Sequence, residues 1–289
     1  MQTVYSCGGN LLDLSHPVVM GILNTTPDSF YDGGHYLSIP DQLKQVEKML
    51  LEGAAIIDIG AVSTRPGAGF VDEEEEIRRL LPVLTAIRKS FPSTIVSVDT
   101  FRSNVARIVI ENGAGMINDI YGGKYDLHMI ETIQSAKIPY IIMHMQGNPE
   151  TMQVSPHYQN IVEDITSFFQ EQIVKFQNGF SQIILDPGFG FGKTTENNFQ
   201  LLHEFQTFKN IGFPLMAGLS RKSMINRVIH TKPSEALNGT TVLNTIALMK
   251  GADILRVHDV KEAVETIALV SSIPSHKAED KGEQEYYPK

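Results

Sequence analysis

The 289-residue chain has a formal net charge of −9, which argues against a basic nucleic-acid-binding surface. Hydrophobic residues make up 42% of the chain, enough for one large barrel or two ordinary domains, and no apolar run approaches the roughly 18 residues of a membrane span. The single cysteine, Cys7, rules out a disulfide framework, and no secretory signal pattern is visible, so we expect a cytoplasmic protein.

Short apolar runs alternate with amphipathic segments along the chain. Residues 1–14 are expected to form a strand pair, and eight apolar runs follow as predicted strands: Val18–Leu23, Ile56–Ile59, Thr94–Val98, Met116–Ile120, Tyr140–Met143, Gln182–Leu185, Leu215–Leu219 and Ile254–Val257. The segments between them place apolar residues at i, i+3, i+4 and i+7, which is typical of amphipathic helices. The acidic run Asp72–Glu76 is predicted to be the solvated first turn of one such helix.

The junction from helix to strand repeats. Five glycines end a helical pattern just before an apolar run, as the left-handed residue after a helix often does: Gly53, Gly113, Gly179, Gly212 and Gly251. Eight such units predict an α/β fold, a single-domain (β/α)8 TIM barrel over residues 1–273, with a doubly wound open sheet as the alternative. Residues 274–289 have no apolar periodicity and are expected to form a flexible tail.

The stretch DPGFGFGKTT (Asp186–Thr195) ends in Gly-Lys-Thr, like a phosphate-binding loop. Such a loop needs a glycine five residues before the Gly-Lys pair, but that position is Pro187, which has no N–H. The dinucleotide-binding pattern also fails, because Lys193 stands at its third glycine. We therefore interpret the loop as a tight turn beside Asp186, with Lys193 on the surface.

Polar residues follow the predicted strands. In a (β/α)8 barrel, functional groups lie at the C-terminal ends of the strands and in the loops after them. Those positions hold Asn24, Thr64, Arg65, Asp99, Asn118, His144, Asp186, Lys222, Arg256 and His258. The Asp and Asn acceptors suit the donor edge of a flat heterocycle, and the basic residues suit an anionic group such as phosphate.

Two other kinds of site fit poorly. The nine histidines are scattered, and His144 has no second ligand at helical spacing, which argues against zinc and favours a packed histidine. The sequence GLSRK around Ser220 resembles a nucleophile elbow, but Lys222 stands where that motif needs glycine.

Eight motifs between residues 18 and 260 resemble those of the bacterial dihydropteroate synthases, pterin-binding (β/α)8 enzymes of folate synthesis. They are GILNTTPDSFYDGG, IDIGAVSTRPGA, SVDTFRSNVA, INDIYGG, MHMQGNP, ILDPGFGFGK, GLSRKSMI and RVHDV, in the family's order. Ala61-Val62 departs from the Gly-Glu common in the family, beside the motif residues rather than on them. The resemblance implies condensation of 6-hydroxymethyl-7,8-dihydropterin diphosphate with p-aminobenzoate, by carbon–oxygen cleavage with cationic character at the pterin methylene.

The resemblance also implies residue roles. The pterin pocket would comprise Asp99, Asn118, Met143, Asp186, Phe191, Gly218, Lys222 and Arg256. The diphosphate site would comprise Asn24, Arg65, Arg256 and His258, with Asn24 also meeting Mg²⁺. The p-aminobenzoate site would comprise Thr64, Pro66, Phe191, Lys222 and Ser223. The catalytic groups would be Asp99, Lys222, Arg256, Thr64 and Arg65, with Thr64–Pro66 and Asp28–Phe30 on two loops that close over the site.

Two other functions stay open: a pterin-dependent methyltransferase of the same barrel family, and a non-catalytic pterin-binding paralogue. The motifs STRPGA, SRKS and RVH favour the synthase, since a methyltransferase needs no diphosphate or carboxylate site. The resemblance further implies a homodimer, a sulfonamide target and small-molecule substrates, with no nucleic-acid or membrane partner.

Overall fold

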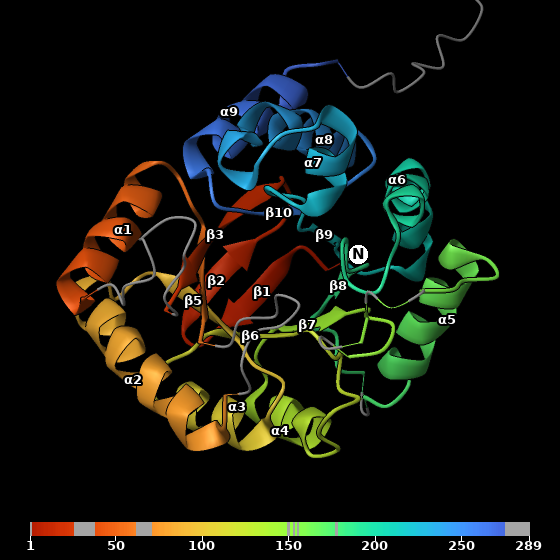
Figure 1. Ribbon diagram of the computed structural model, residues 1–289. Coiled ribbons are helices and arrows are strands. Elements are labelled where there is room, and N and C mark those ends of the chain that lie inside the picture. Colours follow the sequence, from red (N-terminus) through yellow and green to blue (C-terminus); the bar gives the residue numbers. More distant parts are fainter. Residues whose placement is uncertain are drawn as a thin grey trace, which may run out of the picture.

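The computed structural model describes residues 2–25, 38–61, 71–148, 151–152, 154, 156–176 and 179–274. Over these ranges strands and helices alternate, and the helices form a ring around the strands (Figure 1). This is the predicted (β/α)8 barrel. The domain boundary at residue 273 stays a prediction, because residues 275–289 lie outside the described residues.

The barrel wall is a sheet of eight parallel strands in the order β8-β7-β6-β5-β4-β3-β10-β9. The strands are β3 (Val18–Asn24), β4 (Ile56–Gly60), β5 (Ile95–Asp99), β6 (Met116–Asp119), β7 (Tyr140–Met143), β8 (Ile183–Asp186), β9 (Met216–Ala217) and β10 (Ile254–Val257). Apart from β9, each predicted run recurs with its ends displaced by one residue or not at all.

The barrel closes between β8 and β9 with few hydrogen bonds. β9 is shorter than the predicted run Leu215–Leu219, and at its start the Leu215 N–H donates to the Asp253 carboxylate at 2.7 Å instead of to a strand. Two contacts join β8 to the segment before β9: the bridge between Leu185 and Leu215, and a 2.9 Å hydrogen bond from the Leu185 N–H to the Pro214 carbonyl. These contacts close the sheet and exclude the open doubly wound alternative.

The predicted strand pair at the amino terminus is β1 (Val4–Cys7) paired antiparallel with β2 (Asn10–Asp13). Its buried side chains form one cluster with inward-facing residues of the barrel strands: Tyr5, Cys7, Leu12 and Leu14 against Met20, Ile56, Ile95, Met116, Ile141, Ile184, Met216 and Ile254. These strand residues lie near the N-terminal ends of the strands. The hairpin therefore seals the bottom of the barrel and leaves the C-terminal end for a site.

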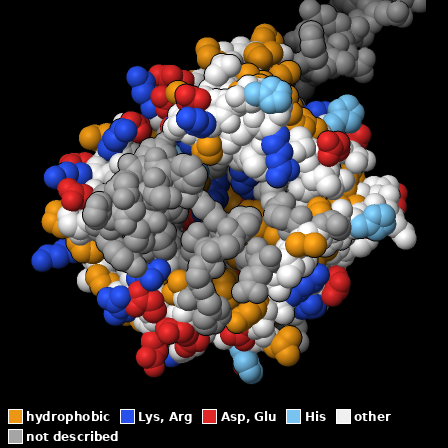
Figure 2. All heavy atoms as spheres, viewed as in Figure 1, with side chains coloured by type: hydrophobic (Ala, Val, Ile, Leu, Met, Phe, Trp, Pro, Cys, Tyr) orange, Lys and Arg blue, Asp and Glu red, His pale blue; other side chains and the backbone are white. Residues whose placement is uncertain are grey.

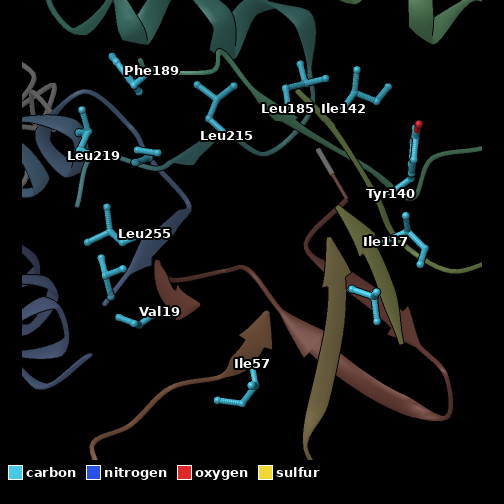
Figure 3. Packing of buried hydrophobic residues seen from close by; sticks show 14 of the residues in the cluster. Val19, Ile57, Ile117, Tyr140, Ile142, Leu185, Phe189, Leu215, Leu219 and Leu255 are labelled. Carbon is cyan, nitrogen blue, oxygen red and sulfur yellow. The ribbon is translucent and has the colours of Figure 1, made fainter. Parts of the chain in front are cut away.

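The other side of each strand packs against the helices. Figure 3 shows Val19, Ile57, Ile117 and Leu255 on their strands, and they belong to one buried cluster that also contains helical residues such as Leu84. Because both faces of the strands are covered, the strands read as nearly continuous apolar runs. A polar residue within such a run is therefore buried and needs a hydrogen-bond or charged partner.

The ring contains α1 (Ile39–Leu51), α2 (Glu73–Ser90), α3 (Ser103–Glu111), α4 (Met129–Ala136), α5 (Ile161–Ile173), α6 (Thr195–His203), α7 (Ser223–Ile229), α8 (Leu237–Met249) and α9 (Val260–Ser271). Short 3₁₀ helices occupy Phe205–Ile211 and Pro233–Glu235. The five glycines predicted at the junctions all have φ between 68° and 101°, as a left-handed cap requires. Among the described helices, none is both long and apolar enough to cross a membrane.

The acidic run at the start of α2 is only partly solvated. Asp72 caps the helix, accepting from the Glu75 N–H at 2.8 Å. Glu76, by contrast, is 0% exposed and forms an ion pair with Arg102. The prediction of a solvated turn is wrong at Glu76, because this residue shares the buried face of the helix with Leu80.

Candidate active site

Polar residues occupy inward positions at the C-terminal ends of the strands. The strand register places Asn24 beside Gly60, Gly60 beside Asp99, and Asp99 beside Asn118, in one row from β3 to β6. Asp186 ends β8 beside Met143 of β7. The alternation of a strand turns all of these residues toward the barrel interior.

Asp186, Gly218 and Lys222 come together at one side of this interior. Asp186 is 4% exposed, and its Oδ1 accepts from the Gly188 N–H at 2.8 Å. A Cβ atom added at Gly218 would lie 3.8 Å from the Lys222 Nζ and 4.0 Å from the Asp186 Oδ2. The absence of a side chain at Gly218 therefore leaves the second carboxylate oxygen accessible to a ligand.

Lys222 joins this group to Phe191. Its Nζ donates to the Phe189 carbonyl and lies 4.8 Å from the centroid of the Phe191 ring. Burial lowers the pKa of Lys222 to about 8, although Asp186 opposes the shift. Burial likewise raises the pKa of Asp186, and Lys222 opposes that shift. Each group thus supports the charged form of the other.

Arg256, on β10, lies between two carboxylates. Its Nε donates to Asp58 at 2.7 Å, and its Nη2 lies 3.5 Å from Asp99. Burial opposes the charge on Arg256, but Asp58 and Asp99 outweigh burial and raise its pKa. Burial and Asp58 raise the pKa of Asp99, whereas Arg256 lowers it. Figure 2 shows basic side chains within the hollow at the centre of the molecule.

His258 follows β10 and is held by Ser220. The His258 backbone N–H donates to the Ser220 Oγ at 3.2 Å, and that oxygen lies 3.0 Å from the His258 Nδ1. The Ser220 hydroxyl can donate its proton to Nδ1, and in that tautomer the imidazole proton lies on Nε2. His258 can therefore offer an N–H donor to an anion.

The turn that precedes Lys222 and α7 is fixed by Arg221. Arg221 has φ of 56° and forms a bidentate pair with Asp259, with N–O distances of 2.6 and 2.9 Å. Ser223 is the first residue of α7 and is exposed. The predicted ligands Lys222 and Ser223 are thus adjacent at a rigid corner.

Two predicted loops lie outside the described residues. Thr64, Arg65 and Pro66 fall within residues 62–70, and Asp28–Phe30 falls within residues 26–37. The residues on either side of positions 62–70 are held by arginines: the Arg79 Nη1 donates to the Ala61 carbonyl at 3.1 Å, and the Arg102 Nη2 donates to the Val71 carbonyl at 2.7 Å.

The prediction that Lys193 is a surface residue is wrong. Its side chain is 1% exposed, and its Nζ lies 2.9 Å from the Gly188 carbonyl and 3.1 Å from the His144 Nδ1. The Nζ also donates to the Phe191 carbonyl at 3.0 Å. The lysine therefore pins the glycine-rich turn to the end of β7, and His144 is the packed histidine that the sequence predicts. Burial lowers the pKa of His144 to about 2 and that of Lys193 well below its ordinary value.

Replacing Lys193 with methionine is expected to lower the free energy of unfolding by about 3 kcal/mol, because two buried carbonyl groups lose their donor. Urea denaturation measures this, with Lys44→Met as the control, since the Lys44 side chain is 76% exposed on α1. Equal stability of the two variants would show that the buried contacts of Lys193 do not matter.

The chain is similar to known proteins over most of its length. The model of the pterin-binding enzyme family matches residues 20–258. The dihydropteroate synthase of Escherichia coli strain K12 is 46% identical over 272 residues, which cover 93% of this chain and 96% of that protein. This chain belongs to the dihydropteroate synthase family. It is accordingly an enzyme of the transferase class.

Solved structures of the family have the same fold. The Yersinia pestis dihydropteroate synthase, in complex with a sulfonamide drug, has a TM-score of 0.88 at 42% identity, covering 93% of this chain and 98% of that chain. The Xanthomonas albilineans enzyme with 4-aminobenzoic acid has a TM-score of 0.87 at 36% identity, covering 95% and 100%.

Proposed function

We propose that this protein joins 6-hydroxymethyl-7,8-dihydropterin diphosphate to p-aminobenzoate, releasing 7,8-dihydropteroate and diphosphate. Membership of the dihydropteroate synthase family supports this reaction. The observation that carries the proposal is a barrel end that combines buried acceptors, Asp186 and Asn118, with the cations Lys222 and Arg256. A heterocycle with a donor edge and an anionic tail matches that combination.

Asp186 and Asn118 hold the amino-pyrimidine edge of the pterin. The Asn118 Oδ1 is buried and has no hydrogen-bond partner among the described residues, which suits a group that awaits a ligand donor. Two acceptors facing the N–H groups of the pterin fix its orientation. Met143, Phe191 and Gly218 form the surrounding walls, and Lys222 donates to the ring.

Arg256, His258 and Asn24 bind the diphosphate, together with Arg65, which lies outside the described residues. As the carbon–oxygen bond at the methylene breaks, its electron pair leaves with the diphosphate, and positive character spreads into the pterin ring. Arg256 and His258 stabilise the charge on the leaving group, and Asp99 in its ionised form favours the positive ring. This chemistry requires no covalent intermediate with the protein.

The p-aminobenzoate binds beside Phe191, Lys222 and Ser223, with Thr64 and Pro66 of the undescribed loop completing its pocket. Its nitrogen forms the new bond to the methylene carbon and gives up a proton to diphosphate or water. Holding both substrates in line supplies much of the rate, because the encounter becomes effectively intramolecular.

Mg²⁺ fits this site as a partner of the diphosphate. Among the described residues, no three His, Cys, Asp or Glu side chains are placed to hold a metal ion, so a cage built from the protein does not fit. One amide oxygen, from Asn24, together with diphosphate oxygens and water is the set that Mg²⁺ commonly accepts. When bound, the ion would neutralise charge on the diphosphate.

The proposal extends to assembly, inhibition and location. Apolar side chains are exposed on α7, α8 and α9, including Ile229, Val242, Met249 and Leu269, and they offer a surface for a homodimer. The sulfonamide bound by the Yersinia pestis relative supports sulfonamide sensitivity at the p-aminobenzoate pocket. The cytoplasm suits Cys7, which is a free and buried thiol.

Affinity for pterin diphosphate is expected to fall as the pH rises through about 8, where Lys222 loses its proton. The sign follows from the charge, because the protonated ammonium attracts the anionic substrate and the neutral amine does not. Titration calorimetry between pH 7 and 10 measures the effect, and Lys222→Arg should flatten the profile. The same fall in both proteins would remove Lys222 as its cause.

A turnover assay tests the proposed function. The purified protein with both substrates and Mg²⁺ is expected to form dihydropteroate and diphosphate in equal amounts. No product at saturating substrate would contradict the synthase, and pterin binding without turnover would instead favour the non-catalytic paralogue. Transfer of a methyl group from a methylated pterin would favour the methyltransferase.

A further inference from the structure

Asp58 is a buried acid in the interior of the barrel. It lies on β4 two residues after Ile56, so it faces inward, and it is 0% exposed. A carboxylate at such a depth costs free energy unless charged or hydrogen-bonded partners compensate for it. The residues that bind Asp58 therefore indicate what this buried carboxylate does in the barrel.

Two residues of the proposed pterin site contact the same oxygen of Asp58. The Arg256 Nε donates to Oδ2 at 2.7 Å, and the Asn118 Nδ2 donates to Oδ2 at 3.2 Å. These donors come from β10 and β6, on either side of β4 in the sheet order. Asp58 thus connects three strands at the level where the site begins.

The contact with Asn118 determines which end of its amide faces the ligand. An ionised carboxylate only accepts hydrogen bonds, so the NH₂ group of Asn118 must turn toward Asp58. The Asn118 Oδ1 then points away, and it is buried without a hydrogen-bond partner among the described residues. An amide that was free to flip could equally present a donor there.

We propose that Asp58 is the positioning residue of the pterin site, fixing Arg256 and making Asn118 present an acceptor. This inference rests on the proposed function. It explains how the pocket selects its ligand, because Asn118 and Asp186 then both offer acceptors to the donor edge of the heterocycle.

Replacing Asp58 with leucine removes this control while keeping a side chain of similar length. Both donors use the same oxygen, Oδ2, and leucine offers no acceptor in its place, so the Asn118 amide is free to flip and turn its own NH₂ toward the donors of the pterin. The affinity for 6-hydroxymethylpterin, which has no diphosphate, is expected to fall about 10- to 100-fold.

A double-mutant cycle distinguishes positioning from general damage. Calorimetry with 6-hydroxymethylpterin is carried out on the wild type, Asp58→Leu, Asn118→Ala and the double variant. If Asp58 acts through Asn118, the loss caused by Asp58→Leu shrinks to a few-fold in the Asn118→Ala background. The same factor in both backgrounds would overturn the proposal.

Ser97→Ala is the matched control. Ser97 is the register partner of Asp58 on β5, is 0% exposed, and its Oγ has no hydrogen-bond partner among the described residues. Its pterin affinity is expected to stay within about twofold of the wild type. A loss equal to that of Asp58→Leu would mean that any change in this layer disturbs the pocket, and would overturn the proposal.

If Asp58→Leu does not fold, Asp58→Glu keeps the charge beside Arg256 but displaces the carboxylate from Asn118. Weakened pterin binding by this variant supports the proposal, and wild-type affinity overturns it. Failure of the wild type itself to bind the pterin would instead contradict the proposed function.

Discussion

Replacing Asp186 with asparagine is expected to lower the affinity for the pterin at least about 100-fold. The structure explains why such a small change matters. The Gly188 N–H donates to the Asp186 Oδ1 at 2.8 Å, and this bond will hold the amide oxygen of the variant in the same place. The amide NH₂ must then take the position of Oδ2, where it faces the donors of the pterin.

Titration calorimetry with 6-hydroxymethylpterin measures this loss. Asp41→Asn is the control, since its side chain is 50% exposed on α1 and pairs with Lys44. Unchanged pterin affinity in Asp186→Asn would refute the assignment of Asp186 to the amino-pyrimidine edge.

Replacing Arg256 with alanine is expected to lower kcat/KM about 1000-fold, because the charge developing on the diphosphate loses its main cation in the described site. Affinity for pterin diphosphate should fall more than affinity for 6-hydroxymethylpterin. The free energy of unfolding should also fall by about 3 kcal/mol, since Asp58 and Asp99 are left without their cation.

Steady-state kinetics and binding of the two pterins separate these effects. Arg78→Ala is the control, because the Arg78 side chain is 74% exposed on α2 and lies on the outer ring. Equal losses of affinity for both pterins would remove the anion-binding function of Arg256.

Much of the fold follows from local sequence signals. The apolar runs are strands because both of their faces are buried, and the junction glycines recur because the residue after each helix needs positive φ. The row of Asn24, Asp99 and Asn118 could be predicted as well, since the carboxyl ends of parallel strands meet at one end of a barrel.

Other features depend on contacts between distant segments. The sequence predicts Lys193 as a surface residue because nothing in the local sequence reveals that His144 and two carbonyl groups surround it. Glu76 sits in an acidic run, and its burial depends on Arg102. Strand β9 does not include Leu215, whose N–H donates to the side chain of Asp253, 38 residues away.

Asp58 was missed for a different reason. In a barrel of this kind, functional residues are expected at the ends of the strands and in the loops that follow, whereas Asp58 lies within β4. The alternation of IIDIG carries a usable signal, because an acid two residues after an inward-facing isoleucine must itself face the barrel interior. A charged residue inside an apolar strand is therefore a candidate functional residue, even when it does not lie at the end of the strand.

A crystal structure of the protein with pterin diphosphate and p-aminobenzoate bound tests the central claim most directly. We expect the amino-pyrimidine edge on Asp186 and Asn118, the diphosphate on Arg256 and His258, and the p-aminobenzoate beside Phe191 and Ser223. A pterin bound outside this end of the barrel, or one with its donor edge turned away from Asp186, would contradict the account.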